Sequence, residues 1–161
     1  MDLLSEFLQS VRLSGALFYN GEFSAPWCFR SPQAACLAQS LSAEGDVVIF
    51  HYLLDGGAWV RLEKGSDPVS ARAGEVVIFP HGDAHLMGQG PPTEPVDNGA
   101  QIERILAQAP GSIARMGGGG DVTHVVCGYL VCEPHLGRLL FSGLPRVLCV
   151  PIRGDSSGQW I

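Results

Sequence analysis

From residue 14 onward, short apolar runs alternate along this chain with turns that contain glycine, proline, asparagine or aspartate. Short runs rich in β-branched and aromatic residues are typical of β-strands. The pattern predicts strands at Ser14–Glu22 (ending at the turn Asn20-Gly21), Trp27–Phe29, Asp46–Leu54, Ala58–Leu62, Glu75–Phe79, Val122–Cys132 and Arg146–Val150, and a further strand that begins at His85. Many short strands joined by tight turns indicate a mainly β domain rather than a helical bundle.

The first residues of the chain follow a helical period instead. Asp2 suits an N-cap, and the spacing predicts a short amphipathic helix over Leu3–Val11. The apolar stripe of this helix consists of Leu3, Leu4, Phe7, Leu8 and Val11. A short helix is stabilised mainly by packing. The stripe therefore either caps the β domain or makes a dimer or interdomain contact.

The stretch Arg72–Gln89 concentrates the candidate chemistry. It predicts a strand, a tight turn and a second strand, because proline, glycine and aspartate in the sequence PHGD are turn-forming residues. His81 and Asp83 lie in the turn, and His85 follows directly after it. Three side chains that can bind a metal or a polar ligand are therefore expected at one end of this hairpin.

Two regions lack a regular period. Gly90–Gly99 predicts an exposed loop, Gln101–Ala107 one or two helical turns, and Gly117–Gly120 a flexible connector. This long insertion is either a lid over the mouth of the β domain or a tolerated surface loop. The final segment, Gly154–Ile161, is rich in Gly and Ser apart from Trp160 and predicts a linker.

Composition and charge limit the functional classes. A chain of 161 residues favours one domain. Its net charge of −6, with only 10 Lys and Arg residues, lacks the clustered positive charge that nucleic acids require. No apolar run reaches the length of a membrane span, and the first residues do not resemble a secretory signal. The five scattered cysteines predict a cytoplasmic protein with reduced, mostly buried thiols.

The hairpin also carries a family resemblance. Gly74, Pro80, Gly82 and His85 match the second cupin motif, and Gln89 stands where that motif has asparagine. Together with the sequences FHYLLDGGAWVRL, GGGG and VVCGYL, this stretch resembles the cupin sensor domain of AraC-type transcription regulators.

The resemblance implies a cupin-like double-stranded β-helix, or jelly-roll barrel, with a short N-terminal helix. The sensor domain would cover residues 1–150, and residues 151–161 would be a truncated linker to a C-terminal helix-turn-helix module. That module would contact the DNA, and this domain would not. The expected partners are a small-molecule effector or a metal, and either a monomer or a homodimer is compatible with the resemblance.

The chain departs from metal-binding cupins at three ligand positions. Pro26–Phe29 replaces the His-x-His pair of the first motif, and Ile49 stands where the metal-binding glutamate usually lies. Strand alternation places Ile49, His51 and Leu53 on one face, so His51 should point into the barrel.

The remaining metal-ligand candidates are His51, His81, His85 and Cys127. A thiolate with two or three imidazoles is a reasonable tetrahedral zinc set, and Asp83 could add a fourth ligand or orient an imidazole. The alternative is that His51 is a hydrogen-bonded core residue, that His81 and Asp83 only form the turn, and that Cys127 fills the core. His124 and His135 are expected at the surface.

Three functions remain open on this basis. The first is a sensor domain, with a ligand pocket formed by Trp27, Phe79, Asp83 and Tyr129. The second is a metal-dependent cupin enzyme, a dioxygenase or an isomerase, against which the missing ligands count. The third is a structural dimerisation module. We assign no catalytic residue and expect a regulatory domain rather than an enzyme.

Overall fold

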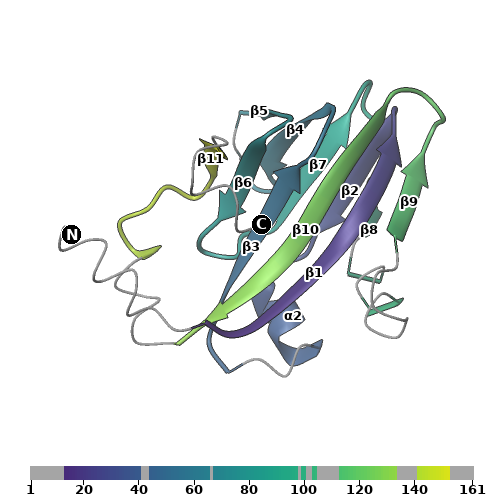
Figure 1. Cartoon of the computed structure of the whole chain (residues 1–161). Helices are drawn as coiled ribbons and strands as arrows, with labels where there is room; N and C mark the ends of the chain where they lie inside the picture. Colours follow the sequence, from purple (N-terminus) through teal and green to yellow (C-terminus); the bar gives the residue numbers. More distant parts are fainter. Residues whose placement is uncertain are drawn as a thin grey trace.

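The computed structural model describes residues 13–40, 44–65, 67–97, 99–100, 103–104, 113–133 and 141–152. Two sheets face each other (Figure 1). One sheet contains, in spatial order, β11 (Leu148–Pro151), β6 (Glu75–Phe79), β3 (Asp46–Leu53), β10 (Val122–Cys132), β1 (Leu13–Ser24) and β9 (Ile113–Gly117). The other contains β5 (Val69–Arg72), β4 (Gly57–Leu62), β7 (His85–Gln89), β2 (Trp27–Ser31) and β8 (Val96–Asp97). The mainly β prediction is confirmed.

The core lies between the two sheets. Ile49, His51 and Leu53 of β3 are fully buried, which confirms that this face of the strand points inward. On β10, the alternate positions Val125, Cys127, Tyr129 and Val131 are buried in the same way. The period of two in these strands therefore decides which side chains meet inside the barrel.

Strand register fixes which inward side chains are neighbours. β10 lies between β1 and β3 and is antiparallel to both. In this register, Cys127 is opposite Tyr19 on one side and opposite His51 on the other. Directly opposite residues on one face have Cβ atoms only about 5 Å apart. The register thus brings a thiol and an imidazole from distant parts of the sequence into contact.

A helix closes one end of the barrel (Figure 1). This helix, α2 (Ala34–Ser40), is tied to the turn after β6 by a hydrogen bond of 2.8 Å from Ala34 N to the carbonyl oxygen of Gly82. Gly82 has a φ of +62°, and a Cβ there would overlap Ala34 and lie 2.7 Å from the carbonyl oxygen of Val47. Only glycine suits a turn this close to the helix.

Several sequence predictions are corrected. The predicted turn at Asn20-Gly21 is wrong, because β1 continues to Ser24 and the ring of Phe23 occupies the space where a side chain at position 21 would lie. The short elements α2, β5, β8 and β9 were not predicted. The edge strand β9 pairs with β1 in parallel, and β8 is a two-residue pairing within the predicted loop.

Other predictions fall partly or wholly outside the described residues. These are the helix Leu3–Val11, most of the helical segment Gln101–Ala107, the linker Gly154–Ile161 and the surface position of His135. All five cysteines are free, and Cys28, Cys127 and Cys132 are buried. None of the helices described is long and apolar enough to cross a bilayer.

Candidate functional site

A line of hydrogen-bonding groups crosses the interior from one sheet to the other. Sγ of Cys127 on β10 lies 3.1 Å from Nδ1 of His51 on β3. Nε2 of His51 lies 2.7 Å from Nε2 of His85 on β7. Nδ1 of His85 lies 2.8 Å from the carbonyl oxygen of Asp83. We refer to Cys127, His51, His85 and this carbonyl as the histidine chain, and its three side chains are fully buried.

The positions of the protons in the histidine chain follow from its fixed end. A backbone carbonyl only accepts hydrogen bonds, so Nδ1 of His85 carries the proton and donates it to Asp83. In a neutral imidazole the other nitrogen is then an acceptor, and His51 must donate from Nε2. Nδ1 of His51 is left to accept from the thiol of Cys127. One set of neutral tautomers therefore satisfies every group.

Burial keeps these groups neutral. Desolvation lowers the pKa of His51 well below its usual range, and the neighbouring His85 lowers it further. Desolvation also lowers the pKa of His85 to about 4, although the hydrogen bond to Asp83 and its charge act in the opposite direction. At the other end, burial raises the pKa of the Cys127 thiol to about 12. None of the three is ionised at neutral pH.

Aromatic rings hold the two imidazoles in place. The ring of Phe79 stacks on His85, with centroids 3.6 Å apart and planes within 7° of parallel. Phe29 and Phe79 flank His51, with ring centroids 5.5 Å and 6.0 Å away. Both phenylalanines are fully buried. The rings exclude water from the histidine chain, and this explains why its pKa values are shifted so far.

Hydroxyl groups surround the thiol end of the histidine chain. A hydrogen bond with Tyr19 lowers the pKa of Cys127, against the larger effect of burial. Burial raises the pKa of Tyr129, Cys127 adds to this, and the hydroxyls of Ser31 and Tyr19 lower it. The hydroxyls of Ser31 and Tyr129 still lack a partner at ordinary hydrogen-bond geometry. Buried polar groups without well-formed hydrogen bonds are rare in protein interiors.

The structure brings together three of the four predicted metal ligands. His51, His85 and Cys127 meet in the histidine chain. His81 lies outside it, exposed at the turn, with Nε2 3.1 Å from the carbonyl oxygen of Leu144. Asp83 pairs with Arg146, at 3.0 Å from Nε and 2.6 Å from Nη2. It therefore orients His85 through its backbone and not through its carboxylate.

The predicted ligand pocket takes a different form. Trp27, Phe79 and Tyr129 are buried between the sheets, and Trp27 bonds Gln89 at 3.1 Å. Phe79 and Tyr129 border the histidine chain, whereas Asp83 lies in a surface groove that Arg30 and Lys64 also line.

His124 was predicted at the surface. It is partly exposed there, and its Nδ1 lies 2.7 Å from Oδ2 of Asp55.

The donor set does not fit a cupin metal site. His51 presents Nε2 to His85 and Nδ1 to Cys127, so its two neighbours lie on opposite sides of its ring. An ion held between the two Nε2 atoms would have the thiol of Cys127 beyond the His51 ring. Zinc sites need three or four converging ligands. Among the described residues, no group of three or more His, Cys, Asp or Glu side chains converges in this way.

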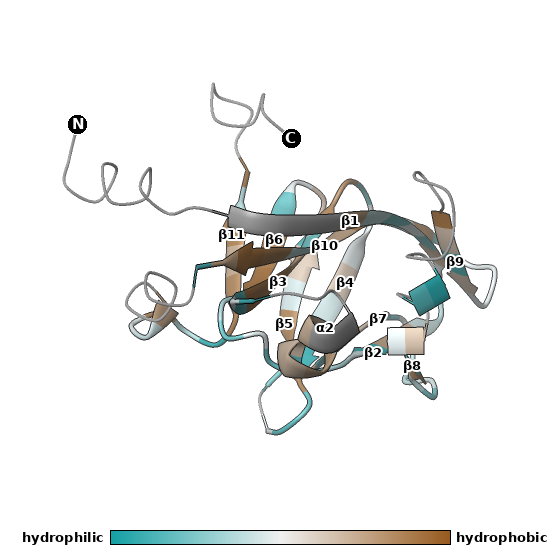
Figure 2. Ribbon diagram, turned by 90° about the horizontal axis from the view of Figure 1, so that it is seen from below, coloured by the Kyte–Doolittle hydropathy of each residue, from teal (hydrophilic) through white to brown (hydrophobic). Residues whose placement is uncertain are grey.

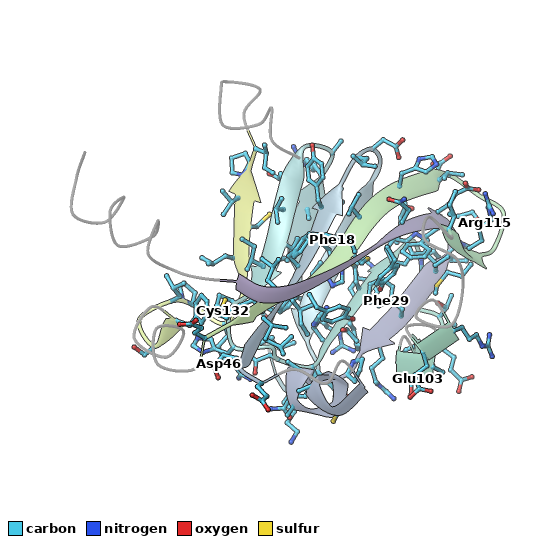
Figure 3. The ribbon with its side chains drawn as sticks, turned by 60° about the horizontal axis from the view of Figure 1, so that its bottom comes forward. Phe18, Phe29, Asp46, Glu103, Arg115 and Cys132 are labelled. Carbon is cyan, nitrogen blue, oxygen red and sulfur yellow. The ribbon has the colours of Figure 1, made fainter. Side chains whose placement is uncertain are left out.

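A polar cavity opens at the end of the barrel that α2 covers. Its volume is about 360 Å³, and it lies between α2, the start of β3 and the turn after β6. Its polar lining consists of Gln33, Asp46, His81 and Ser142. Oδ2 of Asp46 is buried and has no hydrogen-bond partner. Asp46 is opposite Cys132, at the end of β10, and both are labelled in Figure 3.

Sequence reasoning missed this cavity. Asp46 was interpreted only as the first residue of a strand, and α2 was not predicted at all. An acidic residue that begins a strongly apolar strand is the one signal that could have identified it. We call this cavity the end cavity.

The match to a protein family is consistent with this fold. A cupin family model matches residues 2–161. The solved structure of the protein YhaK from Escherichia coli is similar, with 15% sequence identity and a TM-score of 0.45 over 91% of this chain and 53% of YhaK. This chain therefore spans about half the length of YhaK. The search of curated proteins gave no match. Because the family model covers nearly the whole chain, this protein belongs to the cupin family.

Proposed function

We propose that this cupin domain is the effector-binding, regulatory part of an AraC-type transcription regulator, whose DNA contacts are made by a separate helix-turn-helix module. The observation that carries the proposal is the end cavity with its unpartnered Asp46 oxygen. A carboxylate oxygen accepts hydrogen bonds, so the effector is a small polar molecule with hydroxyl or ammonium donors. The net charge of −6 favours a role without direct DNA contact.

The turn after β6 supports a route from the end cavity to the rest of the domain. Pro80 and His81 line the cavity, and Gly82 is bonded to α2. The next residue, Asp83, contacts His85 through its carbonyl oxygen and Arg146 through its carboxylate. Arg146 lies just before β11, the last strand described. An effector that moves this turn would therefore shift the population of C-terminal arrangements.

The chemistry of the interior favours binding over catalysis. General acid–base catalysis works best with a group whose pKa lies near the working pH. The histidine chain instead contains imidazoles with strongly lowered pKa values and a thiol with a raised one. Both nitrogens of each imidazole are already hydrogen-bonded within the histidine chain. A metal-dependent enzyme finds no support in the donor set described above.

A thermal-shift screen of sugars, polyols and primary amines tests the effector site. A compound that binds is expected to raise the melting temperature of the domain, because it stabilises the folded state. Asp46→Ala should abolish that shift. Asp67→Ala should leave it unchanged, because Asp67 is exposed and does not line the end cavity.

The same compounds then test the regulatory role in the full-length gene product. We expect the full-length product to bind promoter DNA in a gel-shift assay and the compound to change that affinity severalfold. The domain alone should not bind DNA. A hit that is unaffected by Asp46→Ala would contradict the site, and salt-sensitive DNA binding by the domain alone would contradict the division of roles.

A further inference from the structure

The end cavity carries a negative charge that no described cation balances. Asp46 and His81 are the titratable side chains among its described lining residues, which include no Lys or Arg. None of the ion pairs between described residues involves Asp46. The carboxylate acts on its neighbour instead: burial raises the pKa of the Cys132 thiol, and the charge of Asp46 raises it further. A cavity of this charge attracts a cation.

The hydrogen-bonding groups of the end cavity favour a ligand that donates. Nε2 of His81 lies 3.1 Å from the carbonyl oxygen of Leu144, which only accepts, so this nitrogen carries the proton. In the neutral ring Nδ1 is then an acceptor, as the Asp46 carboxylate is. An ammonium group has three donors and no acceptor, whereas a hydroxyl has one donor and two lone pairs. The ammonium group therefore suits these acceptors better.

Two other kinds of cation fit the end cavity less well. A calcium or magnesium ion takes several oxygen ligands, and Asp46 is the single carboxylate in the described lining. A guanidinium group binds a carboxylate best through both oxygens. Oδ2 of Asp46 is buried, so the carboxylate presents at most one oxygen to the cavity. An ammonium group is a compact point charge and can bind through that one oxygen.

The remaining lining accommodates a small apolar body. Figure 2 views the barrel from the end that α2 covers. This helix contributes the small residues Ala34, Ala35 and Ala38, and Pro80 and Phe141 add larger apolar side chains. The volume of about 360 Å³ lies near the lower end of the range for ligand pockets, which is roughly 300–1,000 Å³. A short alkyl chain or a single ring suits this space.

We propose, building on the effector site proposed above, that the end cavity binds a small primary amine as its ammonium ion. The ammonium group donates a hydrogen bond to the carboxylate of Asp46, and the apolar body packs against Pro80, Phe141 and the alanines of α2. The alcohol of the same shape lacks the positive charge. The cavity therefore selects amines over alcohols.

Matched pairs of amines and alcohols test this selection. Propylamine and propanol, cyclohexylamine and cyclohexanol, and benzylamine and benzyl alcohol are titrated into the 161-residue chain at neutral pH by isothermal calorimetry. We expect at least one amine to bind about tenfold more tightly than its alcohol, because hydrogen bonds to charged groups contribute more than neutral ones.

Variants of the lining test the role of the carboxylate. Asp46→Asn keeps the shape of the side chain and removes its charge, so it should remove the preference for the amine. Asp67→Asn makes the same change at an exposed position outside the cavity and should retain the preference. If Asp46→Asn does not fold, Ala35→Leu replaces it. Ala35 is exposed on α2 and lines the cavity, so the larger side chain should weaken binding of the amine about tenfold or more.

The outcomes separate this inference from the proposed function. Equal affinities within every pair, or a preference that survives Asp46→Asn, would overturn the choice of an amine. Sugars or polyols that bind through Asp46, while no amine does, would overturn it and leave the effector site in place. Binding of no compound would overturn both. An amine that binds as expected without changing the DNA affinity of the full-length product would support the inference and contradict the regulatory role.

Discussion

Replacing His51 by alanine is expected to lower the free energy of unfolding by about 3–5 kcal/mol. The imidazole is fully buried, so its removal leaves a cavity between Phe29 and Phe79. It also leaves the thiol of Cys127 and Nε2 of His85 without their partner. Both costs add, although the hydrogen bond between Tyr19 and Cys127 remains and reduces the second one. Urea titration at neutral pH measures the change.

His81→Ala is the matched control for this prediction. It removes the same side chain from an exposed turn position outside the histidine chain. We expect a change of at most about 0.5 kcal/mol, as for most surface substitutions. Equal effects of the two substitutions would mean that His51 does not lie in the core as described.

Acidification is expected to destabilise the domain in a defined range. The pKa of His85 is lowered from 6.5 to about 4 by burial, and the pKa of His51 is lowered in the same direction. The unfolded chain therefore binds protons first as the pH falls. The contribution of each histidine to stability is complete above pH 6.5, where both states are neutral, and it is lost as the pH falls from there towards the folded pKa.

The pKa shift of His85 determines how much free energy of unfolding is lost. At pH 5 it amounts to about 2 kcal/mol for that residue alone. Urea midpoints between pH 7.5 and 5 measure it, and His85→Gln should flatten the dependence, because it removes one of the two titrating rings. The exposed Asp55 is no competing explanation, since its pKa is lowered from 3.8 by its hydrogen bonds to His124 and it titrates below this range. Constant stability over the range would contradict the buried, neutral state.

Much of the fold was predictable because burial leaves a clear period in the longer strands. Glu75–Phe79 and Val122–Cys132 were predicted with the bounds that the structure has. The inward direction of His51 followed from the alternation in β3. The short elements were not predictable. α2 has only seven residues and β8 only two, and such short segments do not show a recognisable spacing of apolar residues.

The candidate site was predictable in its members and not in its geometry. The sequence indicated that His51, His85 and Cys127 line one interior. It could not indicate that Cys127 is opposite His51, because strand register depends on the whole sheet. Nor could it indicate that the two nitrogens of His51 face different partners, because that depends on one side-chain rotation. His81 and His85 separate because the turn directs the first into solvent and the second into the core.

The apolar groove on the outer face of the six-stranded sheet shows a further limit of sequence interpretation. The apolar residues on both faces of β3 and β10 are visible in the sequence, and they predict strands covered on both sides. Without the sheet order, nothing indicates which strands form a common outer surface. The structure supplies that order and shows that β1, β3, β6, β10 and β11 share one apolar outer surface.

The central claim is that the barrel encloses a neutral, directional line of hydrogen bonds through His51 and His85. Nitrogen-15 NMR of the histidine rings at neutral pH tests it most directly, because it distinguishes the two neutral tautomers from each other and from the charged ring. We predict the Nε2–H tautomer for His51 and the Nδ1–H tautomer for His85, with both rings neutral. Two rings in the same tautomer, a charged ring, or a metal-bound nitrogen would contradict the account.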